Sequence, residues 1–199
     1  MSEIKHFYET FHPAHYDIYI DIDRGAKTIS GTTKINGDAK EKTVSINQKY
    51  LNIKSVEADG ETVPFKVDDE NEGIHIDLEK TGETTLTISY DAKLTDSMMG
   101  IYPSYYELNG EKKQIIGTQF ETTFARQAFP CVDEPEAKAK FDIAIKFDEQ
   151  PGETILLICQ KSVTKMVFTT SIQLYVCQHT SSPSPLVIFK LRRLRLRVV

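Results

Sequence analysis

Long apolar runs, paired cysteines and a secretory signal are all missing from this 199-residue sequence. No apolar run approaches the roughly 18 residues that a membrane-spanning helix requires, and the N-terminus MSEIKHFYETFHP has neither the basic start nor the apolar stretch of a signal peptide. The three cysteines, Cys131, Cys159 and Cys177, form no CxxC pair, which argues against a disulfide framework or a structural zinc site. We therefore expect a cytoplasmic globular protein with free thiols and no membrane partner.

Acidic residues are missing from the C-terminal part of the chain. All 29 aspartates and glutamates lie at or before Glu153, whereas residues 157–199 contain seven lysines and arginines and no acid. A single continuous domain is not expected to change its composition so sharply. We therefore divide the chain into a domain over residues 1–156 and a tail over residues 157–199.

The first 156 residues carry the pattern of a β-domain. Polar and apolar residues alternate with period two, and turn-rich pieces separate the alternating runs. These runs are HYDIYIDID, KTISGTTKIN, KTVSIN, LNIKSVEA, TVPFKV, GIHIDL, ETTLTISYDA and KAKFDIAIKF. The spacing predicts a mostly β fold, an antiparallel β-sandwich without long helices. We expect a loop over DSMMGIYPSYYELNGEKK, followed by a short strand from Ile115 to Phe120.

The segment GTQFETTFARQAFPCVDEPEAK, residues 117–138, combines many specific residue types without simple periodicity. Its TQFE, AR and FPCVDEP elements resemble the signature of the N-terminal domain of aminopeptidase N-type zinc metallopeptidases, in particular those of lactic acid bacteria. The upstream stretches FHPAHYDIYIDI and MGIYPSYY resemble other landmarks of that domain, in the same order. The resemblance covers residues 1–156 and implies a saddle-like N-terminal β-domain of an aminopeptidase.

This resemblance implies a substrate-binding role for Gln119 and Glu121. In the family, the acidic residue of the TQxE motif helps to hold the α-ammonium group of the peptide substrate, and the glutamine lines the pocket for the first substrate residue. A carboxylate in a water-poor pocket favours a cationic N-terminus over an internal amide. Residues two apart on a strand share a face, so we expect Gln119 and Glu121 to point the same way. Without the motif, both would be ordinary polar positions on a half-exposed strand.

Structural roles account for the other conspicuous residues of the motif. We expect Cys131 to be buried as a small hydrophobic side chain, because a free thiol packs well in a core. Arg126 is expected to pair with Asp133 or Glu134 and so to fix the loop, in preference to a role in catalysis.

Recognisable zinc ligands are missing. His12 and His15 form an HxxH, but Pro13 lies between them and no helical HExxH surrounds them. The chain also lacks the GxMEN stretch that the family uses to bind the substrate N-terminus. We expect this chain to bind no cofactor and to contain no catalytic residue, whereas the full-length family member binds zinc. The implied function is that of an inactive fragment of an enzyme that releases N-terminal amino acids from peptides.

A single-nucleotide loss near Leu157 explains the tail. Codons exist that encode LICQK in the present frame and SNMPE once one T is restored, and the same shift converts MVFTTSIQLYVCQHT into NGVHYFDTTVRMSTY. The restored text regains acidic residues and strand alternation. We therefore predict an out-of-frame tail without native structure. The alternative is a genuine basic segment, PLVIFKLRRLRLRVV, for an anionic membrane or nucleic acid, but we expect neither partner.

A second class of function stays open beside the aminopeptidase fragment. The domain could be a stand-alone, non-catalytic β-sandwich that binds a peptide or another protein. Nucleotides downstream of codon 199 that encode HExxH within a few hundred codons would favour the aminopeptidase.

Overall fold

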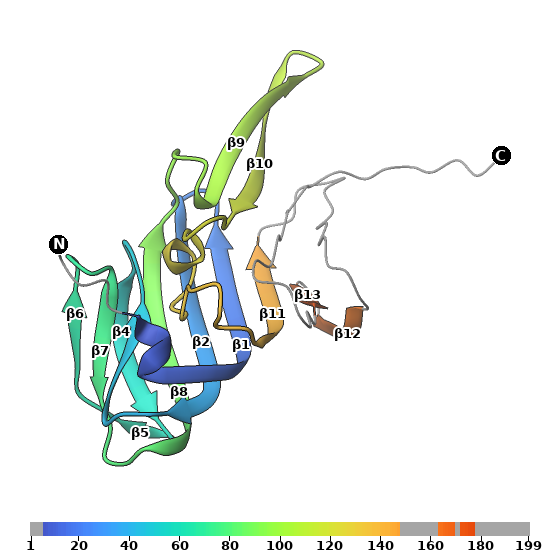
Figure 1. Cartoon of the computed structure of the whole chain (residues 1–199). Coiled ribbons are helices and arrows are strands. Elements are labelled where there is room, and N and C mark those ends of the chain that lie inside the picture. The colour runs from blue at the N-terminus through green and yellow to red at the C-terminus, as the bar shows by residue number, and fades with distance from the viewer. Residues whose placement is uncertain (1–5, 148–162, 170–171, 178–199) are drawn as a thin grey trace.

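Strands dominate the computed structural model, which describes residues 6–147, 163–169 and 172–177 (Figure 1). Among these residues only two short 3-10 helices interrupt the strands, and no helix is long and apolar enough to cross a membrane. The elements in chain order are η1 (Phe7–Glu9), β1 (Phe11–Asp23), β2 (Thr28–Ala39), β3 (Thr43–Asn47), β4 (Asn52–Ala58), β5 (Glu61–Thr62), β6 (Phe65–Asp68), β7 (Gly73–Asp77), β8 (Gly82–Lys93), β9 (Gly100–Leu108), β10 (Glu111–Gln119), η2 (Ala125–Gln127), β11 (Lys140–Phe147), β12 (Val163–Thr169) and β13 (Ile172–Cys177).

The largest sheet has six strands in the order β11-β1-β2-β8-β4-β5. Its neighbours are antiparallel except for β1 and β11, which run parallel from His15 beside Lys140 to Ile22 beside Phe147. The prediction of a mostly β, mainly antiparallel fold is confirmed, and the pairing of β1 with β11 is its parallel exception. The long connection through residues 120–139 allows β11 to re-enter the sheet in the direction of β1, which a short hairpin turn cannot do.

A three-stranded antiparallel sheet, β3-β7-β6, completes the body (Figure 1). Alternate residues are buried along most of β1 and β8 in the larger sheet, as the period-two pattern predicts, whereas four successive residues of β3, from Val44 to Asn47, are buried in the smaller one. One cluster of buried side chains runs from Phe7 at the start of the described chain to Ile145 on β11. The core therefore belongs to a single folding unit that includes both sheets and the irregular segment before β11.

Strands β9 and β10 form a long hairpin that extends away from the two sheets (Figure 1). The expected loop over residues 96–113 and the short strand after it are therefore wrong in extent. The turn consists of Asn109 and Gly110, both with positive φ (54° and 78°), a pair that strongly favours two-residue hairpins. The alternation is weak here because both faces of the outer half of the hairpin are exposed.

Two other expectations concern short segments. The run TVPFKV was expected to be one strand, but Pro64 separates β5, which pairs with β4, from β6, which pairs with β7. Proline cannot donate to a strand ladder, so the change of sheet occurs there. In the tail, β12 and β13 pair antiparallel, with Thr169 beside Ile172. Most of residues 157–199 lie outside the described residues, and the out-of-frame origin of this tail stays a prediction.

Candidate functional site

The segment after β10 begins with an exposed corner. Gln119 is the last residue of β10, lies opposite Gly100 in the hairpin and is half-buried. Phe120 is buried and packs edge-on against Phe129, with the ring centroids 5.8 Å apart. Glu121 follows on the surface, in a turn that the hydrogen bond from the Phe124 N–H to the Phe120 carbonyl closes at 3.0 Å. We call residues 119–123 the corner.

The corner brings Gln119 and Glu121 close in sequence but does not place them on one strand face. The strand ends at Gln119, so the alternation argument that was to align the two side chains does not extend to Glu121. Within the described parts of the chain, the Glu121 carboxylate has no hydrogen-bond or ion-pair partner. It is therefore an exposed anionic group available to a cation, next to a half-buried amide.

Arg126, on η2, connects the segment to the body of the domain. Its Nε lies 3.1 Å from Asp133 Oδ2, and its Nη2 donates to the Asp133 carbonyl oxygen at 3.2 Å. The expected pairing of Arg126 with the loop acids is thereby confirmed for Asp133. Its Nη1 donates to Glu72 Oε2 at 3.1 Å, a partner that sequence reasoning missed. Glu72 precedes β7, and no local pattern in the sequence announces a contact over that separation.

Glu134 does not pair with Arg126 and holds the N-terminal turn instead. Its Oε1 accepts a hydrogen bond from the Phe7 N–H at 2.6 Å, and its Oε2 lies 3.4 Å from His6 Nδ1. The Asp133 carboxylate therefore closes the loop onto Arg126, whereas Glu134 ties the loop to the N-terminal turn.

Backbone hydrogen bonds complete this attachment. Asn47, at the end of β3, and Cys131 exchange a pair of backbone hydrogen bonds at 2.8 and 3.1 Å, and the Asn47 side chain accepts from the Asp133 N–H. The hydroxyl oxygen of Tyr16, on β1, accepts from the Val132 N–H at 3.0 Å. The segment thus lies across one face of the six-stranded sheet (Figure 1). The hydrogen bond from Val132 to the Tyr16 hydroxyl joins it to β1.

The thiol of Cys131 is buried, as expected, and is not a nucleophile. Burial, and secondly the nearby Asp133 carboxylate, raise its pKa well above the ordinary thiol value. A thiol reacts through its thiolate, so a raised pKa makes this group inert at neutral pH.

The acids that contact Arg126 respond to burial differently. Burial raises the pKa of Asp133 above its ordinary value, and the charge and hydrogen bonds of Arg126 only partly oppose this effect. Partial burial also acts to raise the pKa of Glu72, but the hydrogen bond from Lys49 and the charges of Lys49 and Arg126 outweigh it, so the pKa of Glu72 is lowered. Glu72 therefore stays ionised between two cations.

Two clusters of one histidine and two carboxylates form in three dimensions, although the sequence shows no ligand spacing. They are His6 with Glu134 and Glu136, and His15 with Asp17 and Asp142. His12 joins neither cluster and stacks on Tyr8 with the ring centroids 4.2 Å apart. Each cluster offers a single histidine, and His15 Nε2 already lies 3.0 Å from Asp142 Oδ2. Neither set fits the donors of a catalytic zinc in a helical HExxH.

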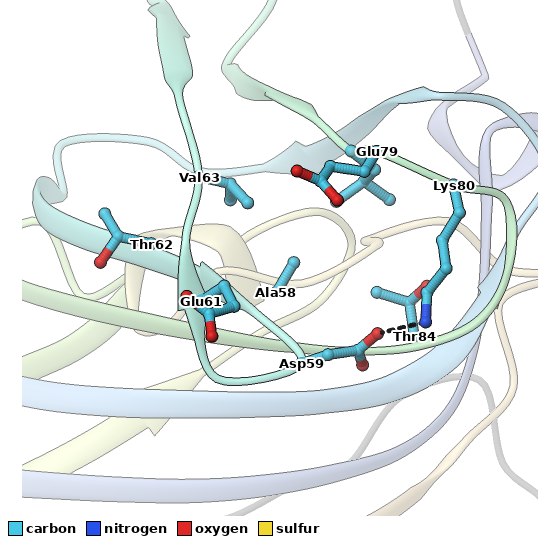
Figure 2. A pocket seen from close by; sticks show the side chains of 9 residues that line it. Ala58, Asp59, Glu61, Thr62, Val63, Glu79, Lys80 and Thr84 are labelled. Atoms are coloured by element: carbon cyan, nitrogen blue, oxygen red, sulfur yellow. Dashed lines mark ion pairs between the residues drawn. The ribbon is translucent and has the colours of Figure 1, made fainter.

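A hollow of about 480 Å³ lies beside β5, between the ends of β4 and β7 and the start of β8. An ion pair between Asp59 and Lys80, at 3.2 Å, crosses its rim (Figure 2). A neighbouring hollow shares Asp59, Lys80 and Thr84. Neither contains Gln119 or Glu121, so the corner is not part of these two hollows.

A β-domain in which TQFE ends in an exposed glutamate, beside a firmly attached FPCVDEP stretch, is the arrangement expected of a peptidase N-terminal domain. The profile of the Peptidase M1 N-terminal domain matches residues 12–165. The chain belongs to the M1 peptidase family and contains its N-terminal domain.

Relatives in lactic acid bacteria are similar over most of this chain. Aminopeptidase N of Lactobacillus delbrueckii subsp. lactis is 62% identical over 153 residues, which make up 77% of this chain and 18% of that protein. Aminopeptidase N of Lactococcus lactis subsp. lactis is 51% identical over 156 residues, again 18% of its length. Aminopeptidase M1-A of Oryza sativa subsp. japonica is 37% identical over 159 residues. The chain thus spans 18% of the length of these bacterial relatives.

Proposed function

We propose that this domain forms one wall of the substrate site in a cytoplasmic, zinc-dependent aminopeptidase that releases N-terminal amino acids from peptides. Glu121 binds the α-ammonium group of the substrate, and Gln119 lines the pocket for the first residue. The observation that carries the proposal is the Glu121 carboxylate, which has no partner among the described residues and stands next to Gln119. The continuation of this corner is bonded to β1, to β3 and to the turn before β7. A fixed carboxylate without a competing cation is what recognition of an ammonium group requires.

It follows from this proposal that the 199-residue chain has no aminopeptidase activity by itself. The histidine-containing clusters of the described chain do not fit a catalytic zinc, and the sequence contains no HExxH. We expect the purified chain neither to hydrolyse aminoacyl chromogenic substrates nor to retain zinc after dialysis. Stoichiometric zinc together with chelator-sensitive hydrolysis would contradict this expectation.

The role of Glu121 is tested in a complete enzyme. Residues 1–156 of this chain would replace the matching segment of the Lactobacillus delbrueckii aminopeptidase N, to give a chimeric enzyme. Glu121→Gln removes the charge and keeps the shape. A charge-assisted hydrogen bond of about 1.5–3 kcal/mol predicts a decrease in kcat/KM of roughly ten- to a hundredfold. Zinc content should not change.

Glu107→Gln is the matched control, because Glu107 is an exposed acid on β9 without a partner among the described residues. It should leave kcat/KM within about twofold of the parent chimera. Wild-type kinetics of Glu121→Gln in an active chimera would refute the substrate role of this residue.

We also propose that residues 157–199 are translated out of frame. The absence of acids after Glu153 supports this origin. Resequencing around codon 157 should show a one-base loss relative to a frame that continues as SNMPE. A downstream region that encodes neither GxMEN nor HExxH in any frame would disprove the frame change and the parent enzyme together.

A further inference from the structure

We propose that Lys49, Glu72, Arg126 and Asp133 form a charge cluster that positions the corner, and that Glu72 is its central residue. The role is that of positioning residues, because none of the four needs to touch the substrate. The inference rests on the proposed function of Glu121, since the corner matters only if it binds the substrate ammonium. The cluster also explains why the corner can be exposed and still be held in one place.

Glu72 links two cations that come from different parts of the chain. Its Oε2 accepts from Arg126 Nη1 at 3.1 Å, and its Oε1 accepts from Lys49 Nζ. The Lys49 backbone N–H in turn donates to the Arg126 carbonyl oxygen at 2.9 Å. The loop after β3, the turn before β7 and helix η2 are therefore closed into one ring of contacts.

The backbone around Glu72 is itself restrained. Glu72 has a positive φ of 52°, and its carbonyl oxygen accepts from the Gln48 N–H at 2.8 Å. At Gly73 a Cβ would lie 2.5 Å from the ring of Phe7, so only glycine fits there. The Glu72 carboxylate is thus presented from a turn that has little freedom to adjust, and it can act as a fixed reference for Arg126.

Partial burial strengthens the ion pairs of the charge cluster. The Arg126 side chain is 12% exposed and that of Asp133 is 13% exposed. Ion pairs that are partly withdrawn from water are screened less than surface pairs, and loss of one partner leaves the other charge unpaired. The four residues carry two positive and two negative charges when ionised, so removal of Glu72 leaves two neighbouring cations with one acid.

Helix η2, which carries Arg126, is connected to the corner by backbone hydrogen bonds and by ring packing. Helix η2 follows directly on the turn of Glu121, and the N–H of Phe124 donates to the carbonyl of Phe120. At the other end of η2, the Phe129 N–H donates to the Ala125 carbonyl, and Phe129 packs on Phe120. A shift of η2 would therefore move both ends of the turn that carries Glu121.

A loosened corner should affect substrate affinity more than turnover. A carboxylate that must be ordered when the substrate binds loses part of its binding free energy to conformational entropy. The contact with the ammonium group is made in both the ground state and the transition state, so its weakening raises KM and changes kcat little.

The test uses the chimeric enzyme with Glu72→Gln and, separately, Arg126→Lys. We expect KM for aminoacyl substrates to rise about three- to tenfold, with kcat within about twofold. Inhibition by leucine should weaken by the same factor, whereas inhibition by 4-methylpentanoate, which lacks the amino group, should not change. If the charge cluster only stabilised the fold, inhibition by both compounds would weaken by the same factor. Glu70→Gln, an exposed neighbour without a partner among the described residues, is the control.

Hydrogen exchange of the 199-residue chain separates this inference from the proposed function. The amides of residues 119–128 should exchange faster in Glu72→Gln and not in Glu70→Gln, while the exchange of β1 and β8 stays unchanged. If exchange increases but Glu121→Gln is kinetically silent, the substrate role fails and only the attachment of the corner stands. Unchanged exchange together with unchanged leucine inhibition in both cluster variants would overturn the positioning role.

Discussion

The corner, residues 119–123, and the anchored stretch, residues 126–134, are close in the chain but differ in the exposure and the bonding of their polar side chains. Side chains of the anchored stretch are mostly buried and bonded to β1, β3, the turn before β7 and the N-terminal turn. The corner exposes Glu121 without a partner among the described residues. The difference indicates a division of labour, in which one stretch supplies stability and the other offers a group for binding.

The largest expected effect comes from the anchored stretch. Phe129 is 2% exposed and packs against Phe120. Phe129→Ala should lower the free energy of unfolding by about 3–5 kcal/mol, because it removes buried apolar surface and leaves a cavity. Thr123→Ala, an exposed corner residue, should change it by less than about 0.5 kcal/mol. Chemical unfolding of the two variants measures both values. An equal decrease in the free energy of unfolding would show that the two stretches contribute equally to stability.

Tyr16→Phe is expected to have an intermediate effect. The variant keeps the ring, which is 1% exposed and stacks on Phe141, but removes the oxygen that accepts from the Val132 N–H. A buried donor without a partner costs about 1–3 kcal/mol. The expected loss in unfolding free energy lies in that range. A variant as stable as the parent would indicate that water satisfies the Val132 N–H and that this attachment contributes little.

Glu72 should make stability sensitive to acid. Its folded pKa is lowered from the ordinary value of 4.5, so its contribution is complete above that value and is lost as pH falls through the folded pKa. Asp133 acts in the opposite direction, because its raised pKa favours the folded state at low pH. Glu72→Gln should therefore flatten the decrease of Tm below about pH 4.5, measured by thermal unfolding against Glu70→Gln. If Tm falls below about pH 4.5 as steeply in Glu72→Gln as in Glu70→Gln, Glu72 does not belong to the charge cluster.

Most strands of the body could be predicted from the sequence, because one buried and one exposed face impose period-two alternation. Strand β8 alternates from Thr84 to Lys93, and β1 and β2 alternate over most of their length. The hairpin of β9 and β10 was missed for the converse reason, since much of it is exposed on both faces and only its Asn109-Gly110 turn signals it. The parallel pairing of β11 depends on a long connection and leaves no local trace.

The candidate site was predictable only where its residues are close in the chain. The pairing of Arg126 with Asp133 followed from charge and proximity. Glu72 and Tyr16, which hold the same stretch from other elements, could not be inferred, because no pattern in a single sequence relates positions so far apart. Likewise, the face alternation invoked for Glu121 failed because β10 ends at Gln119, two residues earlier.

The smallest expected effect on stability belongs to the residue with the largest expected effect on substrate binding. Glu121→Gln removes a carboxylate that has no partner among the described residues, from a chain whose net charge is −5. The substitution removes no favourable contact from the folded state, so the free energy of unfolding should change by less than about 0.5 kcal/mol. In the chimeric enzyme the same substitution should still lower kcat/KM at least roughly tenfold. Chemical unfolding of the 199-residue chain and kinetics of the chimera test the two halves separately. If Glu121→Gln destabilised the chain as much as Tyr16→Phe, the carboxylate would serve the fold, and the distinction between a binding corner and a stabilising anchor would not hold.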